Sequence, residues 1–227
     1  MAGKKIVLTL LLLTVVTTFE ACDPSNLFKC VNRYSPLLPF TITPTRDTIK
    51  VGDTLWIEAN FSDTVVDWES KQKMKYENFD FRLFLTIFEL NDTTTTNQGQ
   101  PIATNKFSIG SKYGTIAKRS KFCPIELKYA DKKYGLKGYV IPNDSGLYLA
   151  HLGSEFLADL VTKSQNISGA NPKCLNYIRD VATQINNGNT HKYLADNKGI
   201  KFVHSNPPDP LREWSYSNMA YYFFVEP

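Results

Sequence analysis

The chain has 227 residues, of which 42% are hydrophobic and 13% are aromatic, which is enough apolar material for the core of one domain. Its formal net charge of +4 is too small to indicate a nucleic-acid-binding protein. The sequence contains no HExxH, CxxC or GxSxG motif and no glycine-rich phosphate loop, so we assign no catalytic residue, no metal and no cofactor.

Residues 1–21 have the pattern of a secretory signal peptide, with two lysines before an apolar run over residues 6–16. That run is too short to cross a bilayer, which needs about 20 residues. Ala21 and Cys22 then resemble the lipobox of bacterial lipoproteins. The resemblance implies acylation of Cys22 and attachment to the outer membrane, with the periplasmic face favoured because no acidic run follows Asp23. Ordinary secretion and an uncleaved anchor are the alternatives.

The remaining cysteines limit the possible disulfides, and the prolines indicate a tether at the start of the mature chain. If Cys22 is acylated, three cysteines remain, so one disulfide and one free thiol follow, or no disulfide at all. We expect the disulfide to join Cys123 and Cys174, because Cys30 lies in a presumed tether. That tether is predicted over residues 22–39, which carry three prolines, and it is expected to pack partly on the domain.

A domain over residues 40–227 is predicted to be mainly β. A short strand is expected over PFTITP, residues 39–44, and residues 55–61 alternate cleanly between apolar and polar positions. In this second strand the side chains predicted to face inward are Leu55, Ile57, Ala59 and Phe61. The longest predicted strand is the run 79–90, whose second face is half apolar and therefore needs a cover. Weaker strands are predicted at residues 107–109, 125–129 and 138–141.

Residues 143–150, with the sequence NDSGLYLA, resemble the Asp-x-Gly-x-Tyr signature that opens strand F of immunoglobulin folds. The resemblance implies a structural corner made by Asp144, Gly146 and Tyr148, in which the tyrosine hydroxyl bonds to nearby backbone. Ala150 stands where antibody-type domains have a cysteine, so the intersheet disulfide is not expected. A plain turn before an apolar strand is the alternative interpretation.

A long insertion, at about residues 153–218, precedes the last predicted strand at 219–225, which would be strand G beside strand F. Asn171 and Pro172 are typical of a helix start. Apolar side chains then recur at helical spacing, at Leu175, Ile178, Val181, Ala182 and Ile185. Residues 154–161 fit a helix or a strand. The expected fold is therefore an immunoglobulin-like antiparallel sandwich with a partly helical insertion.

Three surface features are candidates for binding. A stiff polar segment in the insertion could bind a partner through Asn206, Pro207, Pro208 and Trp214. A basic stretch could meet anionic head groups or an acidic polysaccharide through Lys112, Lys118, Arg119, Lys121, Lys128, Lys132, Lys133 and Lys137. Aromatic residues that could stack on sugars are Trp56, Trp68, Trp214 and Tyr216. The alternatives are solvated strand faces for the lysines and core positions for the aromatic residues.

From the sequence we expect a lipid-anchored, non-enzymatic envelope protein that binds another protein, as an accessory subunit of an outer-membrane assembly. Glycan binding through exposed aromatic residues is the alternative function, and a hydrolase comes third. The expected partners are thus the membrane through the lipid, an envelope protein or a glycan, and not nucleic acid.

Overall fold

A computed structural model of the protein describes residues 31–90, 101–154, 167–168, 174–197 and 218–227. Most of these residues are in β-strands, and α3 (Tyr193–Asp196) is a short α-helix. The other helical residues of the described chain are in two short 3-10 helices, η1 (Thr104–Lys106) and η3 (Asn186–Gly188), and at Asn218 and Met219 before the last strand. The predicted mainly β architecture is therefore confirmed.

The first large sheet has six strands in the order β3–β17–β13–β7–β10–β9. Their bounds are β3 (Thr48–Lys50), β17 (Ala220–Glu226), β13 (Gly146–Ser154), β7 (Leu83–Glu89), β10 (Cys123–Glu126) and β9 (Thr115–Ile116). Strands β13 and β17 pair antiparallel over Gly146–His151, whereas β3 runs parallel to β17. The last strand therefore lies beside β13, as the immunoglobulin-like interpretation requires.

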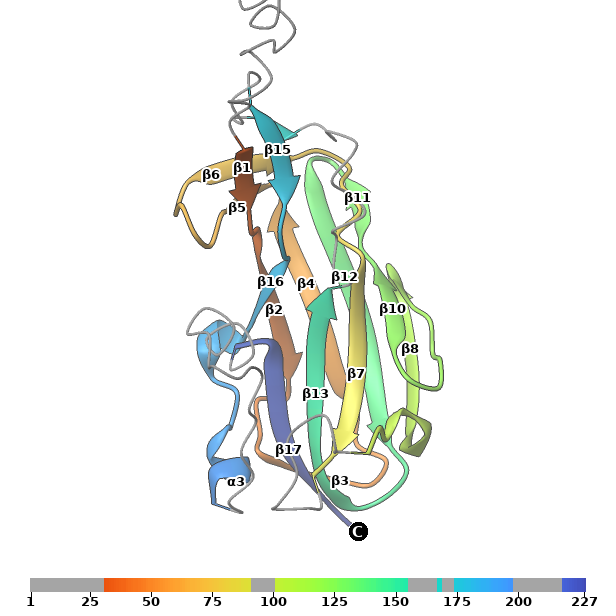
Figure 1. The fold of residues 1–227 in the computed structure, drawn as a ribbon. Helices are drawn as coiled ribbons and strands as arrows, with labels where there is room; N and C mark the ends of the chain where they lie inside the picture. The colour runs from red at the N-terminus through yellow and green to blue at the C-terminus, as the bar shows by residue number, and fades with distance from the viewer. Residues whose placement is uncertain (1–30, 91–100, 155–166, 169–173, 198–217) are drawn as a thin grey trace, which may run out of the picture.

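The second large sheet has the order β11–β12–β4–β2–β16, with β8 also paired to β12. Their bounds are β11 (Lys128–Ala130), β12 (Lys133–Pro142), β4 (Leu55–Ser62), β2 (Leu37–Thr43), β16 (Ala182–Ile185) and β8 (Phe107–Tyr113). Two small sheets join β1 (Val31–Tyr34) to β15 (Leu175–Ile178), and β14 (Ile167–Ser168) to β6 (Lys73–Tyr76) and β5 (Thr64–Val66). In Figure 1, β13, β7 and β17 cross in front of β2, β4 and β12, which gives a sandwich.

The core of the sandwich comes from the inward faces of both large sheets. As predicted for the strand at 55–61, its alternate residues Leu55, Ile57, Ala59 and Phe61 are all buried. The bulkiest fully buried side chains of the core are Tyr76, Tyr134, Tyr148, Tyr221, Phe107 and Phe223. A separate apolar cluster covers part of the other face of the first sheet, where Ala195 of α3 packs with Tyr222 and Leu149. Phe88 packs against this cluster, so the half-apolar second face of β7 has a cover.

Strand β7 is shorter than the predicted strand at 79–90. Asn78 and Arg82 both have positive φ angles, of 46° and 45°, which a regular strand does not contain. The backbone N–H of Phe79 donates instead to the hydroxyl of Tyr134, 2.5 Å away. Pairing therefore begins only at Leu83.

The helix predicted to begin at Asn171 is wrong. The described part of that stretch forms β15 and β16, which run parallel to β1 and β2 respectively. The buried residues Ile178 and Ile185 do belong to the core, but from β-strands, and buried Val181 lies in the short link between the two strands. Apolar residues at these spacings fit one helix or two short strands equally well, and only the distant partners β1 and β2 decide between them. Residues 154–161, for which a helix and a strand are both predicted as alternatives, lie outside the described residues except for Ser154.

The tether predicted over residues 22–39 is too long. Val31–Tyr34 and Leu37–Thr43 are strands, and Tyr34, Ser35 and Leu38 are buried. The domain therefore begins no later than Val31, and any tether is confined to the residues before it. Two strands that pair in parallel with a segment about 145 residues away leave no local signal that sequence reading could detect.

The corner around Tyr148 has the geometry expected from the sequence. Its side chain is fully buried, and its hydroxyl donates to the carbonyl oxygens of Asp144 and Ser145, at 3.3 and 3.2 Å. Burial raises the pKa of Tyr148, so the hydroxyl stays protonated and able to donate. Lys106 adds a second link, because its ammonium group pairs with both Glu89 and Asp144.

Replacing Tyr148 by phenylalanine should lower the free energy of unfolding by about 1 kcal/mol, because one hydrogen bond is lost while the ring stays in place. Urea titration followed by circular dichroism measures the change. Tyr113→Phe is the control, because its ring is 41% exposed, and it should change the stability by no more than a few tenths of a kcal/mol. Equal stabilities of the Tyr148→Phe variant and the wild type would contradict the structural role of the corner.

The cysteines differ from the predicted arrangement. Cys123 is a buried free thiol on β10 of the first sheet, where it lies opposite Leu85 of β7. Burial raises the pKa of the Cys123 thiol, which keeps it neutral. Cys174 is disulfide-bonded. The predicted Cys123–Cys174 disulfide is therefore wrong, because β10 holds Cys123 in the sheet core and away from the strand that follows Cys174.

We expect Cys174 to be bonded to Cys30. Cys30 directly precedes Val31 in the sequence and Cys174 directly precedes Leu175, and Val31 and Leu175 lie opposite each other in the parallel pair of β1 and β15. Acylation of Cys22 would leave Cys30 as the one remaining partner. Mass spectrometry of the digested, non-reduced protein should find the Cys30–Cys174 peptide, with Cys123 alkylated only after unfolding. A peptide that joins Cys22 to Cys174 would contradict both this pairing and the acylation.

Candidate ligand-binding surface

An exposed group of aromatic side chains lies on the outer face of the second sheet. Along β4 the residues that point away from the core include Trp56 and Glu58, and on β12 they include Lys137 and Tyr139. The antiparallel register sets Trp56 directly opposite Tyr139, and their rings meet edge to face with centroids 5.9 Å apart. Such pairs add to the stability of a sheet face beyond simple burial.

Two glycines let the tyrosine rings of this face lie against the backbone. Gly110 of β8 pairs with Tyr139, and a Cβ at Gly110 would come within 2.5 Å of the Tyr139 hydroxyl oxygen. Gly135 of β12 lies under Tyr113, where a Cβ would come within 2.5 Å of a ring carbon. Any larger residue at either position would force the ring away from the sheet. The glycines therefore let both tyrosine rings lie close against the sheet.

Three lysines stand over these rings. The ammonium groups of Lys112 and Lys137 lie 4.7 and 5.1 Å from the centroid of the Trp56 ring. Lys128 lies 5.0 Å from the centroid of Tyr113. Such cation–π contacts are worth about 0.5–1 kcal/mol at exposed sites, so a ligand can displace them. We call this surface the aromatic–lysine face, defined by Trp56, Tyr113, Tyr139, Lys112, Lys128 and Lys137.

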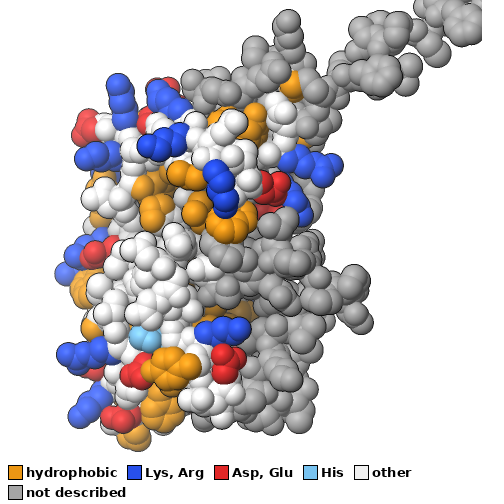
Figure 2. Space-filling view, turned by 90° about the vertical axis from the view of Figure 1, so that its left-hand side faces the viewer, with side chains coloured by type: hydrophobic (Ala, Val, Ile, Leu, Met, Phe, Trp, Pro, Cys, Tyr) orange, Lys and Arg blue, Asp and Glu red, His pale blue; other side chains and the backbone are white. Residues whose placement is uncertain are grey.

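The face carries an excess of positive charge. Glu58 pairs with Lys137 at 2.7 Å, whereas Lys112 and Lys128 form no ion pair with any residue that the structure describes. A neighbouring side of the molecule, shown in Figure 2, has lysine and arginine side chains interspersed with aspartate and glutamate. The local excess of positive charge is thus a property of the aromatic–lysine face and not of the whole surface.

Sequence reasoning found this surface only in part. Trp56 and the lysines of the basic stretch were candidates, and three of those lysines meet Trp56 or Tyr113. Lys118 is used differently, because it donates to the backbone carbonyl of Phe107 at 2.5 Å. Tyr113, Tyr139 and the two glycines were missed, although the alternation of Gly135, Lys137 and Tyr139 is visible in the sequence.

The other predicted aromatic and partner-binding residues are not on this face. Trp68 lies in the turn between β5 and β6, with the Lys71 ammonium 3.3 Å from its ring centroid. Asn206, Pro207, Pro208, Trp214 and Tyr216 lie outside the described residues, as does the acylation candidate Cys22.

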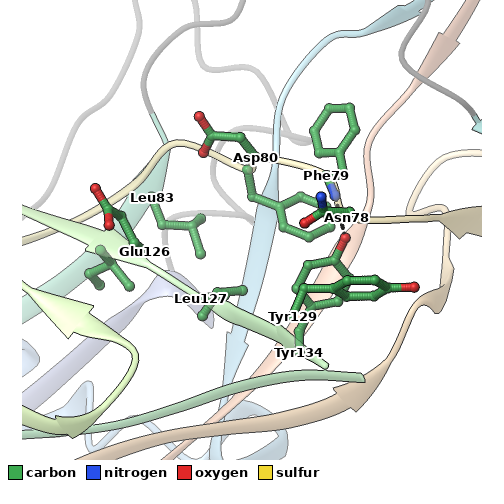
Figure 3. A pocket seen from close by; sticks show the side chains of 10 residues that line it. Asn78, Phe79, Asp80, Leu83, Glu126, Leu127, Tyr129 and Tyr134 are labelled. Atoms are coloured by element: carbon green, nitrogen blue, oxygen red, sulfur yellow. Dashed lines mark hydrogen bonds between the residues drawn. The ribbon is translucent and has the colours of Figure 1, made fainter. Parts of the chain in front are cut away.

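A cavity of about 210 Å³ opens at the start of β7. Figure 3 shows the carboxylates of Asp80 and Glu126 on one side of it and the rings of Tyr129 and Tyr134 on the other. It is lined by Asn78, Phe79, Asp80, Phe81, Leu83, Ile125, Glu126, Leu127, Tyr129 and Tyr134. Burial raises the pKa of Tyr134 to about 12, so its phenol stays protonated. The cavity is smaller than the roughly 300–1,000 Å³ that is typical of ligand pockets, so we do not assign it a ligand.

The histidines suggest no catalytic or metal centre in the described part of the chain. His151 lies in β13 beside the Phe84 ring, with centroids 6.1 Å apart, and His191 packs against Tyr193 and Tyr221. His204 is outside the described residues. Among the residues that the structure places, no three histidine, cysteine or acidic side chains gather as a metal-binding group.

Comparisons with protein-family models and with curated proteins found no match to this chain. The helices of the described segments lack the length and apolar character that a membrane span requires. A functional hypothesis must therefore be built on the chemistry of the aromatic–lysine face.

Proposed function

We propose that this protein is a lipid-anchored, non-enzymatic envelope protein that binds a glycan chain on the aromatic–lysine face. The observation that carries the proposal is the pair of tyrosine rings that lie close against the backbone at Gly110 and Gly135 next to Trp56. Flat, partly exposed aromatic rings offer apolar area to the C–H faces of sugar rings at little conformational cost. The face runs along several strands, which suits an extended chain better than a small molecule.

The proposal places the lipid on Cys22 and the protein at the outer membrane. The apolar leader and the Ala21–Cys22 sequence support this location. Binding to another protein, as a subunit of an outer-membrane assembly, stays a prediction. The residues expected to make that contact lie outside the described ranges. Acylation is tested by labelled fatty acid, which should enter the wild type and not the Cys22→Ser variant. A wild-type mature chain that begins elsewhere and stays soluble would contradict the anchor.

Glycan binding is tested with envelope polysaccharides bound to a resin. A Trp56→Ala, Tyr139→Ala double variant should bind about tenfold more weakly than the wild type, a loss of about 1.4 kcal/mol. Trp68→Ala is the matched control, because Trp68 is also partly exposed and also stands beside a lysine, but lies elsewhere. It should bind like the wild type. If the double variant and the control retained the same fraction of binding, the aromatic–lysine face would not be the glycan site.

A further inference from the structure

We infer that the ligand of the aromatic–lysine face is an acidic polysaccharide, whose carboxylate or sulfate groups pair with Lys112, Lys128 and Lys137. The inference rests on the proposed glycan function and adds the chemical class of the sugar. It follows from three observations, which are the positions of the ammonium groups, the charge of the face and the way its rings are held.

The first observation is that ammonium groups already lie over the rings. Lys112 and Lys137 both stand above Trp56, and Lys128 stands above Tyr113. A neutral sugar that stacked on these rings would displace the ammonium groups and offer them only uncharged hydroxyl oxygens as acceptors. An acidic sugar can instead pair its carboxylate or sulfate with the displaced ammonium group, in a stronger, charge-assisted hydrogen bond. The arrangement therefore favours a ligand with negative charge.

The second observation is the distribution of charge along the strands. On β12, Lys133 and Lys137 point to the same side as Tyr139, and Lys128 of β11 lies opposite Gly135 between them. Alternate residues of a strand are about 6.8 Å apart, so Lys133, Lys128 beside Gly135, and the Lys112–Lys137 pair at Trp56 place positive charge at successive positions along the face. Lys112 and Lys128 have no acidic partner among the described residues, and Glu58 balances only Lys137. A repeating anion matches this pattern better than a single phosphate does.

The third observation separates a polysaccharide from an anionic lipid surface. Aromatic residues that anchor proteins to membranes project into the headgroup region. Here Tyr139 rests on Gly110 and Tyr113 rests on Gly135, so both rings are held down on the sheet. Trp56 is also only partly exposed. The face therefore offers stacking area together with charge, and both tyrosine rings lie close against the backbone of the sheet instead of standing clear of it.

The experiment compares one sugar backbone with and without its charge. Residues 22–227 with Cys22→Ser, which removes the acylation site, are titrated with polygalacturonate and with its methyl-esterified, uncharged form. We expect binding to the acidic form that weakens about tenfold between about 50 and 500 mM NaCl, because salt screens exposed charges. The uncharged form should bind at least tenfold more weakly, which corresponds to about 1.4 kcal/mol.

Two double variants, each with two lysines replaced, test the site. Lys112→Ala with Lys137→Ala should weaken binding of the acidic form about tenfold, a loss of about 1.4 kcal/mol. The matched control is Lys50→Ala with Lys73→Ala, which removes two exposed lysines from other strands, and it should bind like the wild type. Circular dichroism spectra that match the wild type show that each variant is folded. Replacing Lys112 and Lys137 by arginine keeps the charge and should restore most of the binding.

The outcomes distinguish this inference from the function on which it rests. Equal binding of the charged and uncharged forms, both lost on Trp56→Ala, would overturn the acidic-ligand inference and leave glycan binding intact. Binding of neither form, nor of envelope polysaccharide, would overturn both proposals. Stronger binding to vesicles of phosphatidylglycerol, with the same dependence on Lys112 and Lys137, would replace the polysaccharide by a lipid surface and overturn the inference.

Discussion

Replacing Tyr134 by alanine should lower the free energy of unfolding by about 4 kcal/mol, as is typical of a large aromatic residue removed from a core. Only 1% of its surface is exposed, and its ring packs against Phe61 and Phe81, with centroids 5.4 and 5.1 Å away. Its hydroxyl also joins two segments, because it donates to the Tyr76 carbonyl at 2.7 Å and accepts from the Phe79 N–H. Urea titration measures the loss.

Tyr134→Phe separates the two contributions. The ring remains, but the Phe79 N–H and the Tyr76 carbonyl lose their common partner, so we expect a cost of about 1–3 kcal/mol. The alanine variant must then be the less stable of the two. If both variants lost the same stability, the hydroxyl would carry the whole effect and the packing of the ring would contribute nothing.

Replacing Asp67 by alanine should cost about 3 kcal/mol, because its carboxylate is fully buried and accepts several hydrogen bonds. It accepts from the backbone N–H of Ser35, and from the N–H and hydroxyl of Ser70, both at 2.7 Å. Without the carboxylate the buried N–H of Ser35 would have no acceptor. The carboxylate thus ties the junction between β1 and β2 to the turn between β5 and β6. Thermal unfolding should show a clear fall in melting temperature.

Asp53→Ala is the control for this prediction. The Asp53 carboxylate also accepts a backbone N–H, that of Lys50 at 2.9 Å, but the bond is exposed to water. Water can replace the lost acceptor there, so the expected cost is below about 1 kcal/mol. Equal costs at Asp67 and Asp53 would show that burial of the Asp67 bonds does not matter.

The strands that the sequence predicts well are those in which apolar and polar side chains alternate along the strand itself. Leu55, Ile57, Ala59 and Phe61 share one face because a strand has a period of two, and no distant partner is needed to see it. The corner at Tyr148 is also local, since its hydroxyl reaches back only three and four residues. Both could be predicted because the information lies within a few positions of the chain.

The predictions that are wrong concern structure that is set by residues far apart in the sequence. The stretch around Ile178 and Ile185 was predicted to be helical because its apolar spacing fits a helix, but pairing with β1 and β2 makes it extended. The cysteine pairing failed for the same reason, because the neighbours of Cys123 and Cys174 are set by strands far away in sequence. The aromatic–lysine face depends on the register of β12 with β4 and β8, which no local pattern specifies.

The position of β17 has a consequence for how the chain folds. This strand follows both β3 and β13 in the sequence, yet it occupies an interior place in its sheet, between the two. Neither neighbour can complete its hydrogen bonding until Ala220–Glu226 have been synthesised. Contacts of such long range make folding slow. A chain truncated before Ala220 would leave two unpaired strand edges and an open core, which are the features that lead to aggregation.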